Sequence, residues 1–283
     1  LTSHDVVARV RRLTGERRVG HTGTLDPLAT GVLVLCLGRA TRLVEYVMEG
    51  AKVYRATVRL GIETATWDAE GEIVSEADVR HLSLADIEAV LPRFRGRILQ
   101  TPPMYSALKH KGRPLYRLAR QGVSVERAPR QVEISSLIVC AWKYPDLALE
   151  VTCSKGTYLR ALAHDLGQAL GVGAYLAELR RTAVGPFRSQ EAVSLEALQE
   201  AALRGDWQRY LLPVEKGLAH LPSATVSAEI ARRIAFGQTA PLPVETEASP
   251  CCAYDGAGRL IAIMVPAAAP GLWRPHKVLA APR

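Results

Sequence analysis

The chain has 283 residues, 48% of them hydrophobic, and a mean hydropathy close to zero. This composition excludes a disordered chain, and the length fits one large domain or two of ordinary size. The net charge of +8 and the isoelectric point near 9.4 indicate an anionic partner. We find neither a signal peptide nor an apolar run of about 18 residues, so we expect a cytoplasmic protein with no membrane span.

The arginine and cysteine content indicates further what kind of ligand the protein binds. The chain has 29 arginines and seven lysines. The planar guanidinium group suits both phosphate binding and base stacking, although a biased genome composition explains the excess equally well. The five cysteines have no zinc-ligand spacing with one another or with histidines. We therefore predict reduced thiols and no metal site.

The N-terminal segment predicts a helix, a tight loop and a strand. Thr2 or Ser3 can cap the helix. The loop over residues 20–31 contains three glycines, a proline and a single carboxylate, Asp26, and the apolar run 32–37 then predicts a buried strand. A polar loop packed against a buried strand can hold one reactive group at a cleft, but an aspartate in this setting is more often a turn residue.

The next elements alternate between helix and strand. A short helix is expected over about 40–48. Lys52–Leu60 alternates apolar with polar residues, and because Arg55 and Arg59 share the polar side, we predict a strand with one wet, basic face. Ser83 caps a helix that runs to about residue 91.

Residues 91–120 contain eight basic residues and no acidic one. Solvated charge runs usually mix both signs, so this segment predicts a surface that binds an anion. A polynucleotide is the favoured ligand and a membrane surface the weaker alternative. Paired prolines exclude regular structure at 102–103, and a short helix is expected from Pro114 to Gly122. We expect a basic thumb over about 92–130.

The remainder predicts a hairpin, an amphipathic helix and a second, smaller unit. Strands are expected at about 131–142 and 147–153, and the helix follows from residue 159. Residues 174–184 are strand-like or helical, and 190–221 predict Leu-rich helices. From about 222 the sequence becomes Pro-rich, with short strands. This mixed order predicts an α+β fold with an antiparallel or mixed central sheet, flanking helices and a domain boundary near 220.

Arg160 is a candidate partner for Asp26. A bidentate arginine would keep a nucleophilic carboxylate ionised and pinned, although an arbitrary Asp/Arg pair is more often a structural salt bridge. Tyr54 and Tyr158 could stack on a flipped base, but core packing explains Tyr54 as well. His21 could fill the space that a base leaves, or it could be a surface residue.

Two further features suggest anion binding without establishing it. Lys155 precedes Gly156 at a helix N-terminus, which could bind an anion or form an ordinary turn. Thr22-Gly23-Thr24 lacks the Gly-Lys-Ser/Thr ending of a nucleotide-triphosphate loop, so we exclude such a site.

Five segments together resemble the motifs of one family. They occur in the family's order and read GHTGTLDPLATGVLVLCLGRATR, KVYRA, MYSALK, CSKGTYLR and LRRTAV. From residue 2 to about residue 190 the chain resembles the TruB family of pseudouridine synthases. Beyond about 222 the resemblance is to the small RNA-binding PUA-like domain found in this family.

The resemblance implies a fold and an activity. Residues 1–220 would form the pseudouridine synthase catalytic domain and 221–283 a small, mostly β PUA-like domain. The implied reaction isomerises uridine 55 in the T arm of tRNA without cofactor or metal. The N-glycosidic bond breaks, the uracil rotates, and it rejoins through C5. Attack on the base, attack on the sugar and formation of a glycal all remain open as the first step.

The resemblance also implies residue roles. Asp26 would be the essential aspartate, Tyr54 would stack on the base and assist proton transfer, and Arg160 would pair with Asp26. The expected substrate-binding residues are His21, Tyr158, Leu179, Lys109, Lys155 and Arg181. The implied partner is tRNA, and we expect a monomer that needs no other protein.

The chain departs from the family pattern at two places. A Lys-Pro-x-Gly stretch normally precedes Thr-Ser-His-Asp and helps to wall the active site, and it is not seen ahead of residues 2–5. Ala65 stands where the family usually has an aspartate. Two alternatives to a stand-alone synthase remain: a guide-RNA-dependent relative that works with partner proteins, and a non-catalytic RNA-binding module or tRNA chaperone.

Overall fold

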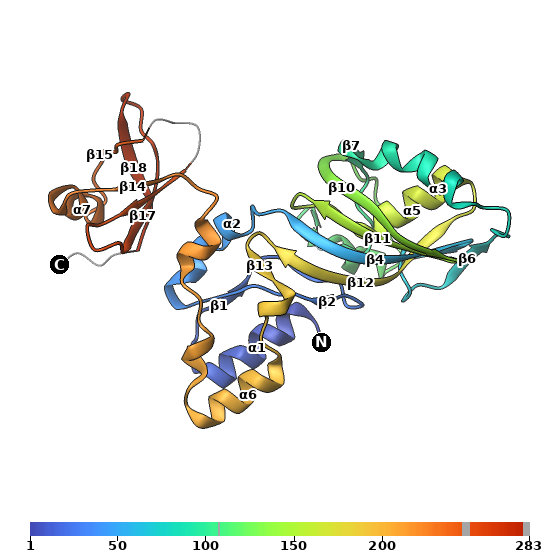
Figure 1. The fold of residues 1–283 in the computed structure, drawn as a ribbon, viewed down its shortest axis with the longest axis horizontal. Coiled ribbons are helices and arrows are strands. Elements are labelled where there is room, and N and C mark those ends of the chain that lie inside the picture. Colours follow the sequence, from blue (N-terminus) through green and yellow to red (C-terminus); the bar gives the residue numbers. More distant parts are fainter. Residues whose placement is uncertain (107, 245–249, 280–283) are drawn as a thin grey trace.

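A computed structural model describes residues 1–106, 108–244 and 250–279, and its centre is a long mixed sheet (Figure 1). The strands of this sheet are β2 (Thr30–Gly31), β4 (Lys52–Leu60), β7 (Gly96–Gln100), β10 (Arg130–Lys143), β11 (Asp146–Cys153), β12 (Ala174–Val184) and β13 (Phe187–Arg188). Their order is β13-β12-β4-β11-β10-β7, and β2 pairs in parallel with β12 while the other pairs are antiparallel. The α+β class with a mixed sheet is therefore confirmed.

Strict alternation of side chains forms the buried face of this sheet. On β11, Leu147, Leu149 and Val151 are at most 1% exposed, because successive strand residues point to opposite faces. Helices α3 (Leu84–Val90) and α5 (Leu159–Leu170) pack in the same core as these side chains. Each fully buried aliphatic side chain of this kind contributes roughly 1.5–3 kcal/mol.

The opposite face of β4 carries Arg55 and Arg59, which the sequence predicted as a wet, basic face. Arg59 donates two hydrogen bonds to Asp146, at 2.8 and 2.7 Å, and Arg55 lies 3.6 Å from Glu150. Both acids are on β11, in register with the arginines. The strand and its solvent-facing arginines are as predicted, but cross-strand carboxylates balance their charge.

The N-terminal part begins with α1 (Ser3–Thr14), capped by Thr2 in a capping box with Asp5. A two-stranded sheet follows, made of β1 (Val19–His21) and β3 (Leu35–Leu37), and then the 3₁₀ helix η1 (Gly38–Leu43) and α2 (Val44–Val47). The strand expected over 32–37 is therefore only three residues long, because Val32 bonds to Arg181 of the central sheet and the Val34 carbonyl accepts from the Thr22 amide.

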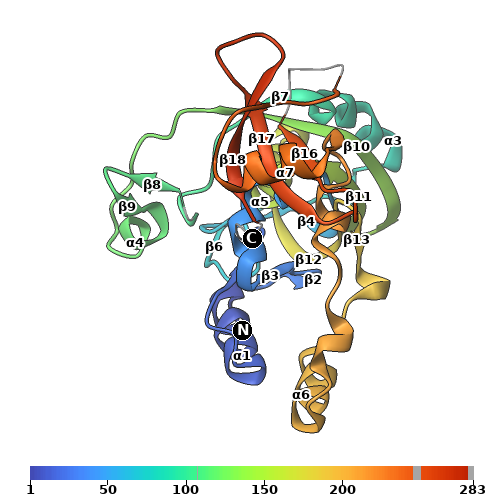
Figure 2. The ribbon, with the colours of Figure 1, turned by 90° about the vertical axis from the view of Figure 1, so that its left-hand side faces the viewer.

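Two hairpins extend from the central sheet. The first pairs β5 (Ile62–Thr64) with β6 (Ile73–Glu76). The second belongs to the basic thumb, where β8 (Lys109–His110), β9 (Arg113–Pro114) and α4 (Leu115–Ala119) project from the body of the molecule (Figure 2). The 3₁₀ helix η2 (Leu91–Phe94) and β7 precede this projection, and β7 is an edge strand of the sheet. The projecting thumb therefore begins after Gln100.

Residues 190–221 are less helical than predicted. They contain one α-helix, α6 (Leu195–Arg204), which packs against α1. The rest is made of short 3₁₀ helices: η3 (Ser189–Glu191), η4 (Trp207–Tyr210) and η5 (Val214–Leu218). Gly205 in the left-handed conformation ends α6, and Pro213 begins η5, so the Leu-rich pattern is broken into pieces.

A second sheet lies at the C-terminal end and stands apart from the central sheet (Figure 1). Its elements are β14 (Ser223–Thr225), α7 (Ala228–Ala235), β15 (Ala240–Pro241), β16 (Cys251–Tyr254), β17 (Leu260–Pro266) and β18 (Leu272–Val278). The strand order is β14-β16-β17-β18-β15, around a core of its own that includes Trp273.

Segment 39–46 ties this second sheet to the rest of the chain. Arg42 donates to the Val278 carbonyl at 2.5 Å, and Lys277 lies 2.9 Å from Glu45.

All five cysteines are free. None of the helices in the described part of the chain has the length and apolar character needed to cross a bilayer.

Candidate active site

The loop that carries Asp26 is held by hydrogen bonds on both sides of this residue. The Leu25 amide donates to the Ser3 hydroxyl of α1 at 2.9 Å, and the Ala29 amide donates to the Asp26 carbonyl at 2.9 Å, which closes a turn. These bonds hold the Asp26 backbone in place before any ligand binds, as a rigid site requires.

Arg181, on β12, supports this loop from the interior. Its side chain is 1% exposed, and it donates to the carbonyls of Val32 and Gly23 at 2.7 and 3.1 Å. Gly31 lies directly against the Arg181 backbone: its φ is +100°, and a Cβ there would be 2.1 Å from the Arg181 carbonyl oxygen. Arg181 was expected among the substrate-binding residues, and here it contacts the Asp26 loop and the Tyr54 side chain.

The Asp26 carboxylate and the Arg160 guanidinium form a bidentate ion pair. Arg160 Nε donates to Oδ2 at 3.1 Å, and Nη2 donates to Oδ1 at 2.9 Å. The Arg160 side chain is 6% exposed, whereas that of Asp26 is 29% exposed. The carboxylate is therefore oriented from behind and open at the front, as a group that reacts with an external ligand must be.

The same guanidinium has two further acceptors that sequence reasoning missed. Nη2 donates to the Tyr105 carbonyl at 2.8 Å, and Nη1 lies 3.3 Å from Asp68 Oδ2. Asp68 is 2% exposed and follows β5 in the turn of the β5–β6 hairpin. In the sequence, nothing marked Asp68 as a site residue except its position three residues after Ala65.

Tyr54, Tyr158 and Leu179 converge from three elements. Tyr54 lies on β4 with its side chain buried, Tyr158 caps the N-terminus of α5, and Leu179 is buried on β12. Gln100 holds Tyr158 in place: its side chain accepts from the Tyr158 amide at 2.8 Å and donates to the Tyr158 carbonyl at 3.0 Å.

Burial makes both phenol groups harder to ionise than an ordinary tyrosine. Desolvation raises the pKa of Tyr54 and of Tyr158 above their ordinary value, and the Asp26 carboxylate raises both pKa values further. The Arg181 guanidinium opposes this effect on the pKa of Tyr54. At neutral pH both side chains are therefore neutral hydrogen-bond donors.

His21 lies at the end of β1, at the start of the Asp26 loop. Its Nδ1 accepts from the Gly23 amide at 3.3 Å. Partial burial, and then the positive charge of Arg181, lower the pKa of His21 below its ordinary value of 6.5. The imidazole is therefore neutral at pH 7 and can lie next to a base without adding charge.

The two lysines in the predicted site are exposed and lie on other parts of the surface. Lys109 is on β8 in the thumb. Lys155 is 3.1 Å from Glu49, with its side chain 58% exposed. The structure thus brings Asp26, Tyr54, Tyr158 and Arg160 together, whereas these lysines could contact only an extended ligand.

All eight basic residues of segment 91–120 are exposed. Among them, Arg95 donates to the Leu137 carbonyl at 3.2 and 2.9 Å. The others present positive charge along η2, β7 and the thumb. Because Arg160 binds the Tyr105 carbonyl, the thumb begins directly beside the Asp26 carboxylate.

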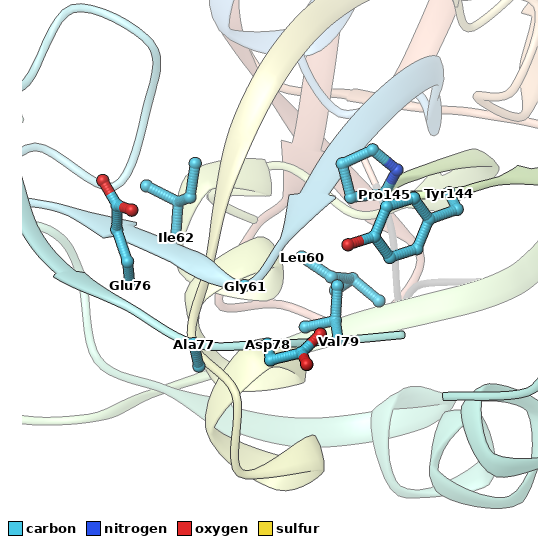
Figure 3. Close-up of a pocket in the computed structure, with 9 residues that line it drawn as sticks. All are labelled: Leu60, Gly61, Ile62, Glu76, Ala77, Asp78, Val79, Tyr144 and Pro145. Atoms are coloured by element: carbon cyan, nitrogen blue, oxygen red, sulfur yellow. The ribbon is translucent and has the colours of Figure 1, made fainter. Parts of the chain in front are cut away.

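A cavity of about 400 Å³ lies elsewhere, at the far end of β4 (Figure 3). Its lining includes Leu60, Val79 and Tyr144 together with the carboxylates of Glu76 and Asp78. These acidic groups would repel an anionic ligand, so the cavity does not suit a polynucleotide. Within residues 1–106, 108–244 and 250–279, no three His, Cys, Asp or Glu side chains are placed to hold a metal ion.

Two family models match the chain and meet between residues 159 and 160. One is described as TruB family pseudouridylate synthase (N terminal domain) and matches residues 11–159. The other is described as tRNA pseudouridylate synthase B C-terminal domain and matches residues 160–219. Together they cover the Asp26 loop, the central sheet, the thumb and α6.

Similar curated proteins carry the name tRNA pseudouridine synthase B. The one from Geobacter sulfurreducens is 47% identical over 237 residues, which cover 84% of this chain and 78% of the relative. The one from Burkholderia mallei is 45% identical over 269 residues, covering 93% and 88%. The one from Chromohalobacter salexigens is 48% identical over 244 residues, covering 86% and 78%.

Similar solved structures include two complexes that contain Cbf5 and Nop10. An archaeal box H/ACA sRNP Nop10–Cbf5 complex contains a chain that is 26% identical, with a TM-score of 0.76 over 99% of this chain and 83% of that one. A Cbf5–Nop10–Gar1 complex gives 26% identity and a TM-score of 0.74 over 94% and 74%. These likenesses extend over both sheets.

Proposed function

The chain belongs to the TruB family of pseudouridylate synthases, and we propose that it converts uridine 55 in the T arm of tRNA to pseudouridine. Isomerisation of a tRNA uridine follows from 45–48% identity to tRNA pseudouridine synthases over most of the chain. The single observation that carries the proposal is the partly exposed Asp26 carboxylate, clamped by Arg160 beside a basic thumb that has no acidic residue up to position 120.

The reaction is balanced without any co-reactant. The N1–C1′ bond of the uridine breaks, a C5–C1′ bond forms, C5 loses its proton and N1 takes one up. An ionised carboxylate can begin this sequence by attacking C6 of the base, by attacking C1′, or by removing the proton from C2′. All three routes require Asp26 to be charged and oriented, which is the role we assign to Arg160.

Tyr54 and Tyr158 would hold the uracil while it is detached. We assign to Tyr54 stacking on the base and transfer of a proton, because its buried phenol is neutral and close enough to interact with Asp26. Tyr158 and Leu179 would line the pocket. Stacking on an aromatic side chain contributes roughly 1–3 kcal/mol per base, which helps to keep the free uracil in place between the two steps.

The uridine must leave the folded T arm to reach Asp26, at a cost of a few kcal/mol. Contacts between thumb residues such as Lys109 and RNA phosphates would offset this cost. His21, which is neutral and lies at the start of the loop, would occupy the space that the base leaves. Lys155 would contact the RNA backbone. Arg181 would aid substrate binding by holding the Asp26 loop in place from the interior.

We further propose that the chain acts as a monomer, without a guide RNA or a protein partner. We propose two domains, with residues 1–220 carrying the chemistry and 221–283 forming a PUA-like RNA-binding unit. The separate core of the C-terminal sheet supports this division, as does the end of the second family match at residue 219.

The test is to incubate the purified chain alone with an unmodified tRNA transcript and to map pseudouridine by carbodiimide labelling and reverse transcription. We expect one modified position, uridine 55, and the same product in an isolated T-arm stem-loop. A transcript with cytidine at position 55 is the matched control. Modification only after addition of guide RNA or partner proteins would contradict the proposal, and so would modification at another uridine.

A further inference from the structure

Trp67 lies at the centre of a group of stacked side chains next to the Asp26–Arg160 pair. Its indole is stacked on the His164 imidazole, with 4.2 Å between ring centroids and 12° between planes. The Arg127 guanidinium carbon lies 5.9 Å from the indole centroid. His164 Nδ1 is 3.3 Å from Glu63 Oε1. The group therefore joins the β5–β6 hairpin, helix α5 and the returning limb of the thumb.

The backbone of Trp67 has an unusual conformation. Its φ is +62°, a left-handed value that only one other described non-glycine residue, Lys111, shares. An aromatic residue rarely adopts this conformation unless its surroundings impose it. Here the Trp67 amide donates to the Thr64 carbonyl at 3.1 Å, and its carbonyl accepts from Leu176 of β12 at 3.0 Å.

This turn directs the next residue, Asp68, into the interior. Thr64 Oγ1 donates to the Asp68 carbonyl at 2.7 Å, and the Asp68 carboxylate accepts from the Glu70 amide at 3.1 Å. The carboxylate then lies 3.3 Å from Arg160. A displacement of Trp67 would thus move one of the acceptors that fix the Arg160 guanidinium.

Helix α5 provides a second connection between the stacked side chains and Arg160. His164 is four residues after Arg160, so the two side chains project from the same face of the helix. Arg127 donates to the Pro102 carbonyl at 3.0 Å, which joins the two limbs of the thumb at their base. Ala65 stands in this hairpin where the family usually has an aspartate. It is exposed and has no carboxylate that could secure the turn.

We propose that Trp67 is a positioning residue for the isomerisation: its stack on His164 fixes the turn that carries Asp68, and Asp68 holds Arg160 in line with Asp26. This inference rests on the proposed function and adds a residue outside the reacting groups. Trp67 acts on the chemical step through Asp68. It does not contribute to the affinity for tRNA.

The test measures single-turnover pseudouridine formation and tRNA affinity for the wild type, Trp67→Gly and Trp67→Phe. Glycine tolerates the positive φ, so Trp67→Gly keeps the turn accessible while it removes the stack. We expect this variant to lose about 10–100-fold in rate, as small misplacements in a site do, with tRNA affinity within about threefold of the wild type. Trp67→Phe restores a ring and should recover most of the rate.

Two comparisons separate positioning from general damage. Trp142→Ala removes a partly buried indole from β10, at a contact with Tyr144, and should leave the rate unchanged. In an Asp68→Asn background, adding Trp67→Gly should cause little further loss, because both act through one contact. A wild-type rate in Trp67→Gly, or losses that multiply in the double variant, would overturn the inference. An inactive wild-type chain would instead refute the proposed function.

Discussion

Arg160 connects most of the groups that define the site. One guanidinium binds the Asp26 carboxylate, the Asp68 carboxylate and the Tyr105 carbonyl. A buried arginine with two carboxylates is stable only where its planar set of donors is matched by acceptors in fixed places. The same match orients Asp26, so the stability of the interior and the geometry of the reactive group depend on one side chain.

The sequence indicated some of these residues and not others, for physical reasons. Asp26 and Arg160 are 134 positions apart and were paired through family motifs, since no local pattern encodes such a contact. Asp68 was missed because its burial depends on the β5–β6 hairpin folding back onto α5. Arg181 was assigned to substrate by its place in a motif, and its hydrogen bonds to the Asp26 loop, which no local pattern encodes, were not predicted.

His21 should give the stability of the protein a measurable pH dependence. Its pKa in the folded state is below 6.5, the value it regains on unfolding. The unfolded chain therefore binds more protons once the pH falls below about 6.5, and stability declines in that direction. We expect the free energy of unfolding of the wild type, measured with urea, to fall between about pH 7.5 and 5.5.

The His21→Gln variant isolates this contribution. Glutamine does not titrate, so part of the decline should disappear, and the difference between variant and wild type should shrink as the pH falls. A decline with the same slope in both proteins would show that other groups account for it.

At the scale of elements, periodicity and helix caps predicted the strands and helices whose formation depends on local sequence. β4, β10 and β11 follow from alternating side chains, and α3 begins at the Ser83 cap as expected. Periodicity failed where tertiary contacts divide an apolar run. Residues 32–37 read as one strand, but Val32 is bonded to Arg181 of β12 and Val34 to Thr22.

Gly31 makes the geometry of the Asp26 loop testable. A Cβ at this position would clash with the Arg181 carbonyl, and its φ of +100° suits only glycine. We expect Gly31→Ala to displace the loop, to destabilise the fold by more than about 2 kcal/mol and to reduce activity sharply. Thermal unfolding and pseudouridine formation are the measurements.

Gly15 supplies the matched control for this substitution. It also has a positive φ, +71°, at the end of α1, but a Cβ there would meet no atom within 4 Å. Gly15→Ala should therefore cost only about 1–2 kcal/mol, the ordinary penalty of a left-handed alanine, and should preserve activity. Equal effects of the two substitutions would contradict the account of the loop.

At the scale of the whole molecule, the positive charge is distributed unevenly. Arg55 and Arg59 are balanced by carboxylates on the open face of the sheet, whereas the basic residues of the thumb have no acidic neighbours in the sequence from 91 to 120. The net charge predicted an anionic partner correctly, but only the fold shows which arginines remain available to one.

The thumb should dominate the salt dependence of tRNA binding. Each phosphate contact contributes roughly 0.7–0.9 to the slope of log affinity against log salt. Changing Lys109, Lys111 and Arg117 to glutamine together should weaken binding and reduce the slope by about two units. Arg80, paired with Asp78 at the far end of the sheet, is the control, and Arg80→Gln should leave the slope unchanged. A wild-type slope in the triple variant would exclude the thumb from the interface.

The most direct test of the central claim compares the wild type with Asp26→Asn on one unmodified tRNA transcript. Asparagine keeps the size of the side chain and removes the charge that every route to the broken glycosidic bond requires. Single-turnover pseudouridine formation should fall by at least about 10³-fold. The dissociation constant for tRNA, measured in parallel by filter binding, should change by less than about threefold. An Asp26→Asn variant that still forms pseudouridine at position 55 at a rate near that of the wild type would contradict the account.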